Sequence, residues 1–332
     1  MLRRIVLNNG YMSVDILRKS LVHFKQLRSL VLSYAVSMTD FSLWEVLGTL
    51  TSLENLTLAA DNPPSPFDLV HAPENPKSQS GGLRYFGALE SLDVTSSFFL
   101  IQHLLGFIDS PCLKSIELHT LIDGVDNDSE LEHEPEDLLT PSMTILASKW
   151  SQSLKSLTIT SNVVTHQNSK FLIPLADLHE IQAFSLTGWR MEKNNDALRR
   201  LTMSWRKLRI LKLLPCCSVP AGTGNHTFIS LSNLRIIAKN CPDLHELRIG
   251  LDIDTITPFD DISSKSFCHK LDVLILIGVH QSITQVSLEC QIQIARHLDL
   301  IFPYVKTIKV RSGNWSGVGD LVKLCQDARQ GQ

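Results

Sequence analysis

The stretch Leu244-His245-Glu246-Leu247-Arg248-Ile249 has leucine or isoleucine at its first, fourth and sixth positions. The last two of these apolar residues are two apart, so in an extended strand both point to the same side. Glu246 and Arg248 then point to the opposite side. The stretch therefore predicts a short strand with one apolar face and one charged face.

The same pattern recurs along the whole chain. Its apolar positions are Leu2/Ile5/Leu7, Leu27/Leu30/Leu32, Leu53/Leu56/Leu58, Leu89/Leu92/Val94, Leu113/Ile116/Leu118, Leu154/Leu157/Ile159, Ile181/Phe184/Leu186, Leu208/Leu211/Leu213, Leu244/Leu247/Ile249, Leu271/Leu274/Leu276 and Val305/Ile308/Val310. Six of the ten spacings between successive copies lie within 24 to 27 residues. Leucine-rich repeats have periods of roughly 20 to 29 residues. One such hexamer is commonplace, whereas its recurrence indicates a repeat array.

Helical periodicity fills several of the gaps between copies, at residues 14–22, 41–50, 195–205 and 283–301. Each strand can bury its apolar side only with a helix and with both neighbouring repeats. We therefore predict an α/β leucine-rich-repeat solenoid, a horseshoe of about eleven irregular repeats. Its parallel sheet forms the concave face and its helices the convex face. Residues 1–332 are expected to form one domain, with loop insertions near residues 59–82, 119–140 and 214–226.

The composition excludes several classes of protein. With 43% hydrophobic and 20% charged residues, the chain is too apolar for a disordered protein. It has no run of about 18 apolar residues that would predict a membrane span. A net charge of -3 argues against nucleic-acid binding as its main activity. Seven cysteines without CxxC spacing and the lack of a signal-peptide core predict an intracellular protein, cytoplasmic or nuclear.

No motif in the sequence predicts catalysis or a metal site. Eight of the fifteen residues from 123 to 137 are acidic, but Leu131 stands where an EF-hand loop starting at Asp126 needs glycine. Cys216 and Cys217 are adjacent rather than spaced for a metal. Residues 313–317 do not form a GxSxG motif. We therefore expect a non-enzymatic chain with no catalytic residues, no cofactor and no metal.

Three junctions between a predicted helix and a predicted strand carry a family resemblance: residues 240–249, which contain Cys241-Pro242, residues 110–118 and residues 302–305. A helix that ends at Cys-Pro or a similar pair and continues directly into Leu-x-x-Leu-x-Leu resembles the irregular repeats of F-box proteins, notably those abundant in fungi. The resemblance implies a substrate-recognition subunit of an SCF-type cullin-RING ubiquitin ligase, whose repeats hold the substrate while the F-box holds the adaptor. Because a repeat strand begins at Leu2, we expect residues 1–332 to bind a cullin adaptor only if an F-box lies upstream.

Polar residues at the outward positions of the strands are candidates for protein recognition, because their charges alternate in blocks along the predicted sheet. The candidate binding residues are Glu90, Asp93, Lys114, Arg209, Lys212, Arg248 and Trp189. The acidic run at residues 123–137 favours a basic protein partner. A plain solvated sheet face is the alternative for the surface. For the chain, the alternatives are a free-standing repeat scaffold or inhibitor without a ubiquitin link and, more distantly, a fragment of a larger enzyme.

Overall fold

The computed structural model describes residues 2–8, 13–33, 41–60, 85–121, 139–167, 169–191, 195–214, 229–251, 269–278, 287–311, 315 and 317–331. The chain divides into two compact units, Met1–Val163 and Val164–Gln332, each of which is described by itself. Loop insertions were predicted near residues 59–82, 119–140 and 214–226, and most of their residues lie outside the described part of the chain. The acidic run at residues 123–137 also lies outside it. The single domain over residues 1–332 stays a prediction.

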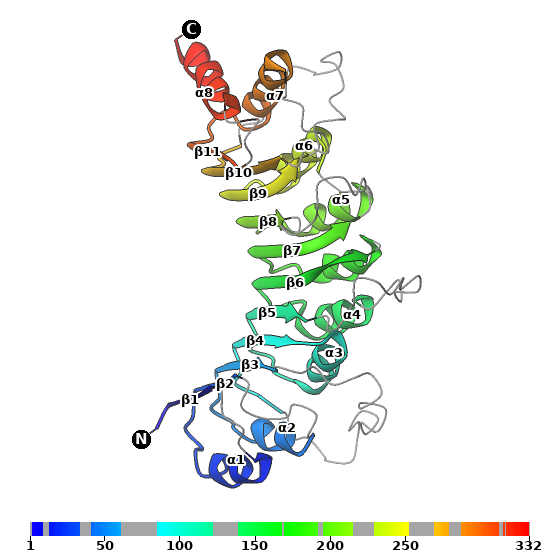
Figure 1. Ribbon diagram of the computed structural model, residues 1–332, viewed down its shortest axis with the longest axis vertical. Helices are drawn as coiled ribbons and strands as arrows, with labels where there is room; N and C mark the ends of the chain where they lie inside the picture. Colours follow the sequence, from blue (N-terminus) through cyan, green and yellow to red (C-terminus); the bar gives the residue numbers. More distant parts are fainter. Residues whose placement is uncertain are drawn as a thin grey trace. The chain divides into compact units, whose positions relative to one another are not determined.

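The first unit alternates strands with helices. Its strands are β1 (Arg4–Asn8), β2 (Ser29–Ser33), β3 (Asn55–Ala59), β4 (Ser91–Ser96), β5 (Ser115–Thr120) and the first residues of β6 (Ser156–Gln167), which continues past the boundary at Val163. Its helices are α1 (Val14–Leu21), α2 (Phe41–Gly48), α3 (Phe98–Phe107) and α4 (Thr140–Trp150). Each strand pairs in parallel with the next one along the chain. The helices lie on one side of these strands (Figure 1).

The second unit has the same plan. Its strands are β7 (Ala183–Met191), β8 (Ile210–Leu214), β9 (Glu246–Leu251), β10 (Val273–Gly278) and β11 (Thr307–Val310), and its helices are the 3-10 helix η1 (Ser169–Asp177), α5 (Asn195–Ser204), α6 (Leu231–Asn240), α7 (Leu288–Ile301) and α8 (Gly317–Gln330). These strands are also parallel and follow chain order. No helix in the described part of the chain is long and apolar enough to span a bilayer.

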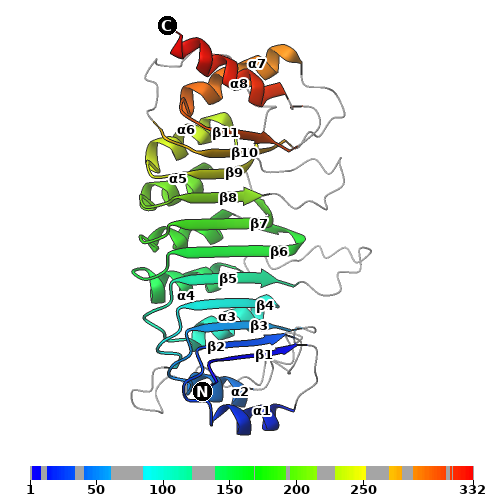
Figure 2. The same ribbon diagram turned by 90° about the vertical axis from the view of Figure 1, so that its left-hand side faces the viewer.

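The apolar rows of the repeat form the core. Leu211, Leu247 and Leu274 stand in register on β8, β9 and β10, and each is at most 1% exposed. In the first unit, β2 shows the predicted alternation, with Leu30 and Leu32 fully buried between partly exposed neighbours. Figure 2 shows the strands of each unit side by side, with their face away from the helices toward the viewer. The predicted α/β leucine-rich-repeat solenoid is confirmed.

The helix predictions are also confirmed, with small differences at the ends. Residues 14–22, 41–50 and 195–205 correspond to α1, α2 and α5, each one or two residues shorter than predicted. The fourth prediction, residues 283–301, corresponds to α7 from Leu288 onward, and its first residues lie outside the described part. Helix α6 ends at Asn240, where Pro242 follows the fully buried Cys241. Proline cannot continue a helix, so this pair separates α6 from β9.

Burial of His269 predicts a loss of stability in acid. The side chain is 5% exposed, its Nε2 lies 2.7 Å from the carbonyl oxygen of Cys241, and its Nδ1 has no hydrogen-bond partner among the residues that the structure describes. Burial lowers the pKa of His269, because a second ring proton would be enclosed without an acceptor. Below the ordinary histidine pKa of about 6.5, the unfolded chain binds more protons than the folded one, so stability falls as pH falls.

The measurement for this prediction is the free energy of unfolding between pH 7 and pH 5, for the wild type and His269→Gln. A glutamine amide can still donate to the Cys241 carbonyl but does not titrate. We therefore expect the variant to lose less stability than the wild type over this range. Equal losses in both proteins would show that His269 does not contribute to the acid sensitivity.

Candidate functional site

A row of four charged residues lies at the amino ends of β2 to β5. We call Arg28, Glu54, Glu90 and Lys114 the charged row, since each directly precedes its strand. The backbone N–H of each later member donates to the carbonyl of the one before it, at 2.8 Å in all three cases. Neighbouring strands are about 4.8 Å apart, so these side chains stand next to one another. The strand register, rather than any loop, therefore sets their spacing.

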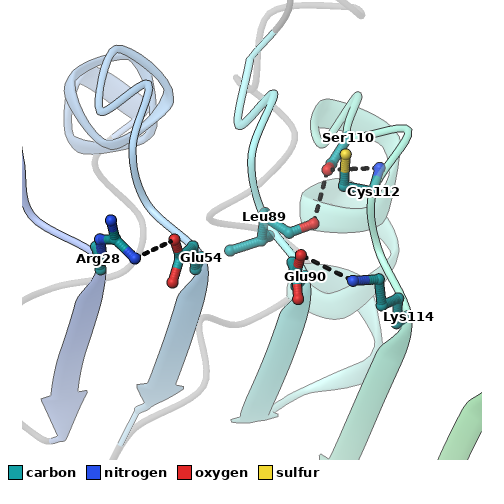
Figure 3. A network of polar contacts seen from close by, with 7 residues as sticks. All are labelled: Arg28, Glu54, Leu89, Glu90, Ser110, Cys112 and Lys114. Atoms are coloured by element: carbon teal, nitrogen blue, oxygen red, sulfur yellow. Dashed lines mark hydrogen bonds and ion pairs between the residues drawn. The ribbon is translucent and has the colours of Figure 1, made fainter.

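The charged row forms two ion pairs. An Arg28 guanidinium nitrogen lies 3.1 Å from a Glu54 carboxylate oxygen, and Lys114 Nζ lies 2.8 Å from a Glu90 oxygen (Figure 3). The hydrogen bond from Lys114 to Glu90 raises the pKa of the lysine. All four side chains are substantially exposed, so the pairs contribute little to stability. They remain available to a binding partner.

A buried hydrogen-bond chain supports the turns that carry Glu90 and Lys114. The Ser110 hydroxyl donates to the carbonyl of Leu89 at 2.7 Å and accepts from the backbone N–H of Cys112 at 3.3 Å (Figure 3). Ser110 is 1% exposed. Because this serine joins the turn before β4 to the turn before β5, the two charged residues are placed by a rigid support.

A second polar group lies further along the same two strands. Asp93 on β4 is directly opposite Glu117 on β5, and His119 follows two residues after Glu117 on the same face. His119 Nε2 is 3.7 Å from an Asp93 oxygen and 3.9 Å from a Glu117 oxygen. Burial raises the pKa of Asp93, while His119 opposes the shift and the neighbouring Glu117 carboxylate adds to it.

In the second unit, Glu246 on β9 brings two basic residues together. Its Oε1 accepts a hydrogen bond from Arg248 Nε and lies 3.8 Å from Lys212 Nζ on β8. Lys212 and Arg248 are also direct register partners. Arg209 precedes β8 and is exposed, and its backbone N–H donates to the carbonyl of Gln182 at 2.7 Å. With three basic side chains and one acidic side chain, this face of β8 and β9 carries a net positive charge.

Apolar residues at outward positions of the second unit expose little surface. Ile210 and Val273 are half-buried, and Ile275 is only 5% exposed. In register, Ile275 lies between Arg248 and Lys309, whose aliphatic stems can cover it while their charged ends reach water. Alternation along the strand places these residues on the correct face, but it does not show how much of each is covered.

The structure joins some of the predicted binding residues and adds others. Glu90 pairs with Lys114, Asp93 joins Glu117 and His119, and Lys212 and Arg248 share Glu246. Trp189 belongs to β7, but its side chain lies outside the described part of the chain. Sequence reasoning left Glu117, His119 and Glu246 out of the candidate site. The available signal was their spacing, because residues two apart on a strand share a face.

Comparisons with known proteins add likenesses of fold. No protein-family model and no curated protein matches the sequence. Among solved structures, the chain is similar to an internalin (inlF) of Listeria monocytogenes, with 16% identity over 92% of this chain and 68% of that one and a TM-score of 0.37. It is also similar to the structure of the Rad7 and Elc1 complex in yeast, with 14% identity over 85% of this chain and 58% of that one and a TM-score of 0.40.

Proposed function

We propose that this chain is a protein-binding module whose recognition surface is the face of the sheet opposite the helices. The observation that carries the proposal is the register of charged side chains on this face. In the second unit, Lys212 and Arg248 stand side by side with Glu246 between their charged ends. A rigid strand array loses little conformational entropy when it binds, so it suits recognition of another protein.

The charge of the second unit's face favours an acidic segment of the partner. Arg209, Lys212 and Arg248 supply positive charge, and Glu246 orients two of the three. The basic partner expected from the acidic run at residues 123–137 concerns a different part of the chain. Electrostatic complementarity raises the rate of encounter and excludes partners of the wrong charge, and both effects weaken as salt increases.

The test measures the affinity of a purified partner, first captured with the full chain from a cell extract, for three proteins. These are the wild type, the double variant Lys212→Glu/Arg248→Glu and the control Arg199→Glu/Arg200→Glu. Arg199 and Arg200 are exposed residues of α5, on the helix side of the sheet. The two double variants change the net charge equally, so a difference between them reports position rather than charge.

We expect the sheet variant to weaken binding at least tenfold, which corresponds to about 1.4 kcal/mol, while the control binds like the wild type. Raising the salt concentration should reduce this difference. Loss of binding in the control alone would place the partner on the helices and contradict the proposal.

A more specific proposal is that the bound protein is the substrate of an SCF-type ubiquitin ligase. Its support is the resemblance of the junction at Cys241-Pro242 to the repeats of F-box proteins. The proposal rests on this resemblance alone, because no family model and no curated protein matches the sequence. Ubiquitylation of the captured partner in cells with and without this chain tests it. Dependence on the chain would support a ligase receptor, and unchanged ubiquitylation would favour a free-standing scaffold.

A further inference from the structure

Among the described residues, Asp93, Glu117 and His119 form a group of side chains whose ligand atoms lie close enough together to hold a metal ion. The three side chains come from adjacent strands and share one face, because Asp93 is opposite Glu117 and His119 is two residues further along β5. One ligand atom from each, two carboxylate oxygens and an imidazole nitrogen, lies within 4.8 Å of the other two. Strand pairing thus brings together three groups that are ordinary metal ligands.

The charges of the group are unbalanced. Two carboxylates directly opposite each other on neighbouring strands repel. In the charged row, Glu54 and Glu90 each face a basic side chain, whereas the ion pairs described for Asp93 and Glu117 are both with His119. An imidazole carries positive charge only when it is protonated, and then only one unit. A divalent cation would balance both carboxylates and leave the imidazole neutral.

We propose that Asp93, Glu117 and His119 bind a divalent transition-metal ion, with Zn²⁺ as the ion that fits best. Imidazole nitrogen combined with carboxylate oxygen suits Zn²⁺ and its neighbours in the first transition row, whereas Ca²⁺ and Mg²⁺ are bound by oxygen ligands. Three protein ligands leave a fourth position for water or another ligand, as in zinc sites that are open to solvent. The expectation from sequence spacing alone was that the chain has no metal site.

The three ligand atoms are somewhat further apart than zinc requires. Ligands about 2.1 Å from a tetrahedral zinc ion lie roughly 3.4 Å from one another. His119 Nε2 is 3.7 Å and 3.9 Å from the two carboxylate oxygens, so these two distances need to shorten by about half an ångström at most. The ligand atoms all lie within 4.8 Å of one another, so side-chain rotation can bring the two carboxylate oxygens together as well. In register, Asp93 is flanked on its other side by Thr57, and Glu117 by Thr158. These small uncharged neighbours leave room for the side chains to rotate.

The experiment titrates Zn²⁺ into the full chain by calorimetry, with no affinity tag and with the cysteines kept reduced. The variants are Asp93→Asn, Glu117→Gln and His119→Gln, and the control is Glu90→Gln. The control removes one exposed carboxylate at the amino end of β4 without removing a proposed ligand. Because the chain has 12 histidines, of which His119 is one, and 7 cysteines, the comparison is between proteins rather than between absolute stoichiometries.

We expect the wild type and Glu90→Gln to bind one more Zn²⁺ ion than each ligand variant, or to bind it at least tenfold more tightly. Zn²⁺ should also raise the thermal unfolding midpoint of the first two proteins above that of the metal-free chain, and should do so less in the ligand variants. Unfolding scans in a chelator show which variants fold. Asp93→Asn and Glu117→Gln keep the shape of the original side chains, so they suffice for the comparison if His119→Gln does not fold.

Equal Zn²⁺ binding by all five proteins would overturn the proposal. An equal loss of Zn²⁺ binding in Glu90→Gln would also overturn it, because the affinity would then depend on the total negative charge nearby rather than on three specific ligands. Binding of Ca²⁺ or Mg²⁺ as tightly as Zn²⁺ would likewise overturn the proposal, because it would show attraction by charge alone.

Discussion

Truncation of Trp150 to alanine is expected to lower the free energy of unfolding by about 3–5 kcal/mol. Trp150 ends α4, is 1% exposed, and is among the largest fully buried side chains of the described residues. Its indole N–H donates to the carbonyl of Ser110 at 2.8 Å, inside the protein. Alanine leaves a cavity that the surrounding repeats cannot close and removes the donor from a buried carbonyl.

Denaturant unfolding of Trp150→Ala and Trp150→Phe separates the two causes. Phenylalanine retains most of the apolar volume but cannot donate a hydrogen bond, so we expect it to cost about 1–3 kcal/mol. Ser110 also supports the turns before β4 and β5, so the alanine variant should expose the amide of Cys112 to hydrogen exchange. A cost below about 1 kcal/mol for Trp150→Ala would contradict the packing described.

Replacement of Leu247 by alanine is the second large effect, at about 2–5 kcal/mol. Leu247 is fully buried near the start of β9, between Leu211 on β8 and Leu274 on β10. Leu211→Ala is expected to fall in the same range, because it occupies the equivalent position of the preceding repeat. Both costs come from lost contacts with neighbouring repeats, since a solenoid packs each layer mainly against the next.

Denaturant unfolding measures the cost of Leu247→Ala, with Leu324→Ala as the matched control. Leu324 is 63% exposed on α8, so its truncation should change the free energy of unfolding by less than about 0.5 kcal/mol. Hydrogen exchange should show faster opening in β8, β9 and β10 but not in β2 and β3. A neutral Leu247→Ala variant would mean that the repeat register is wrong.

The positions of the strands and of the helices α1, α2, α5 and α7 follow from local sequence. Each copy of the apolar pattern lies at a strand, because residues two apart share a face wherever the backbone is extended. The helices at α1, α2 and α5 follow from the period of 3.6 residues in the same way. The end of α6 before Cys241-Pro242 follows from the missing N–H of proline.

The candidate site could be predicted only in outline. Alternation along one strand is a local property, so it predicts that Lys212 and Arg248 point away from the apolar side of β8 and β9, but their role in binding stays a prediction. The metal-ligand group was missed because Asp93 and Glu117 belong to different repeats, and only the pairing of β4 with β5 makes them neighbours. Spacing within a single segment carries no sign of such a pair.

The sequence by itself therefore determined the repeat, its strands, several of its helices, and which side of each strand is apolar, since these depend on residues a few positions apart. Only the tertiary structure decided that Glu246 holds both Lys212 and Arg248, and that Ile275 is buried at an outward position. The physical reason is that side-chain contacts between strands depend on the hydrogen-bonded register and on the size of the neighbouring side chains. Both are set by residues about 25 to 35 positions apart, beyond the reach of any local pattern.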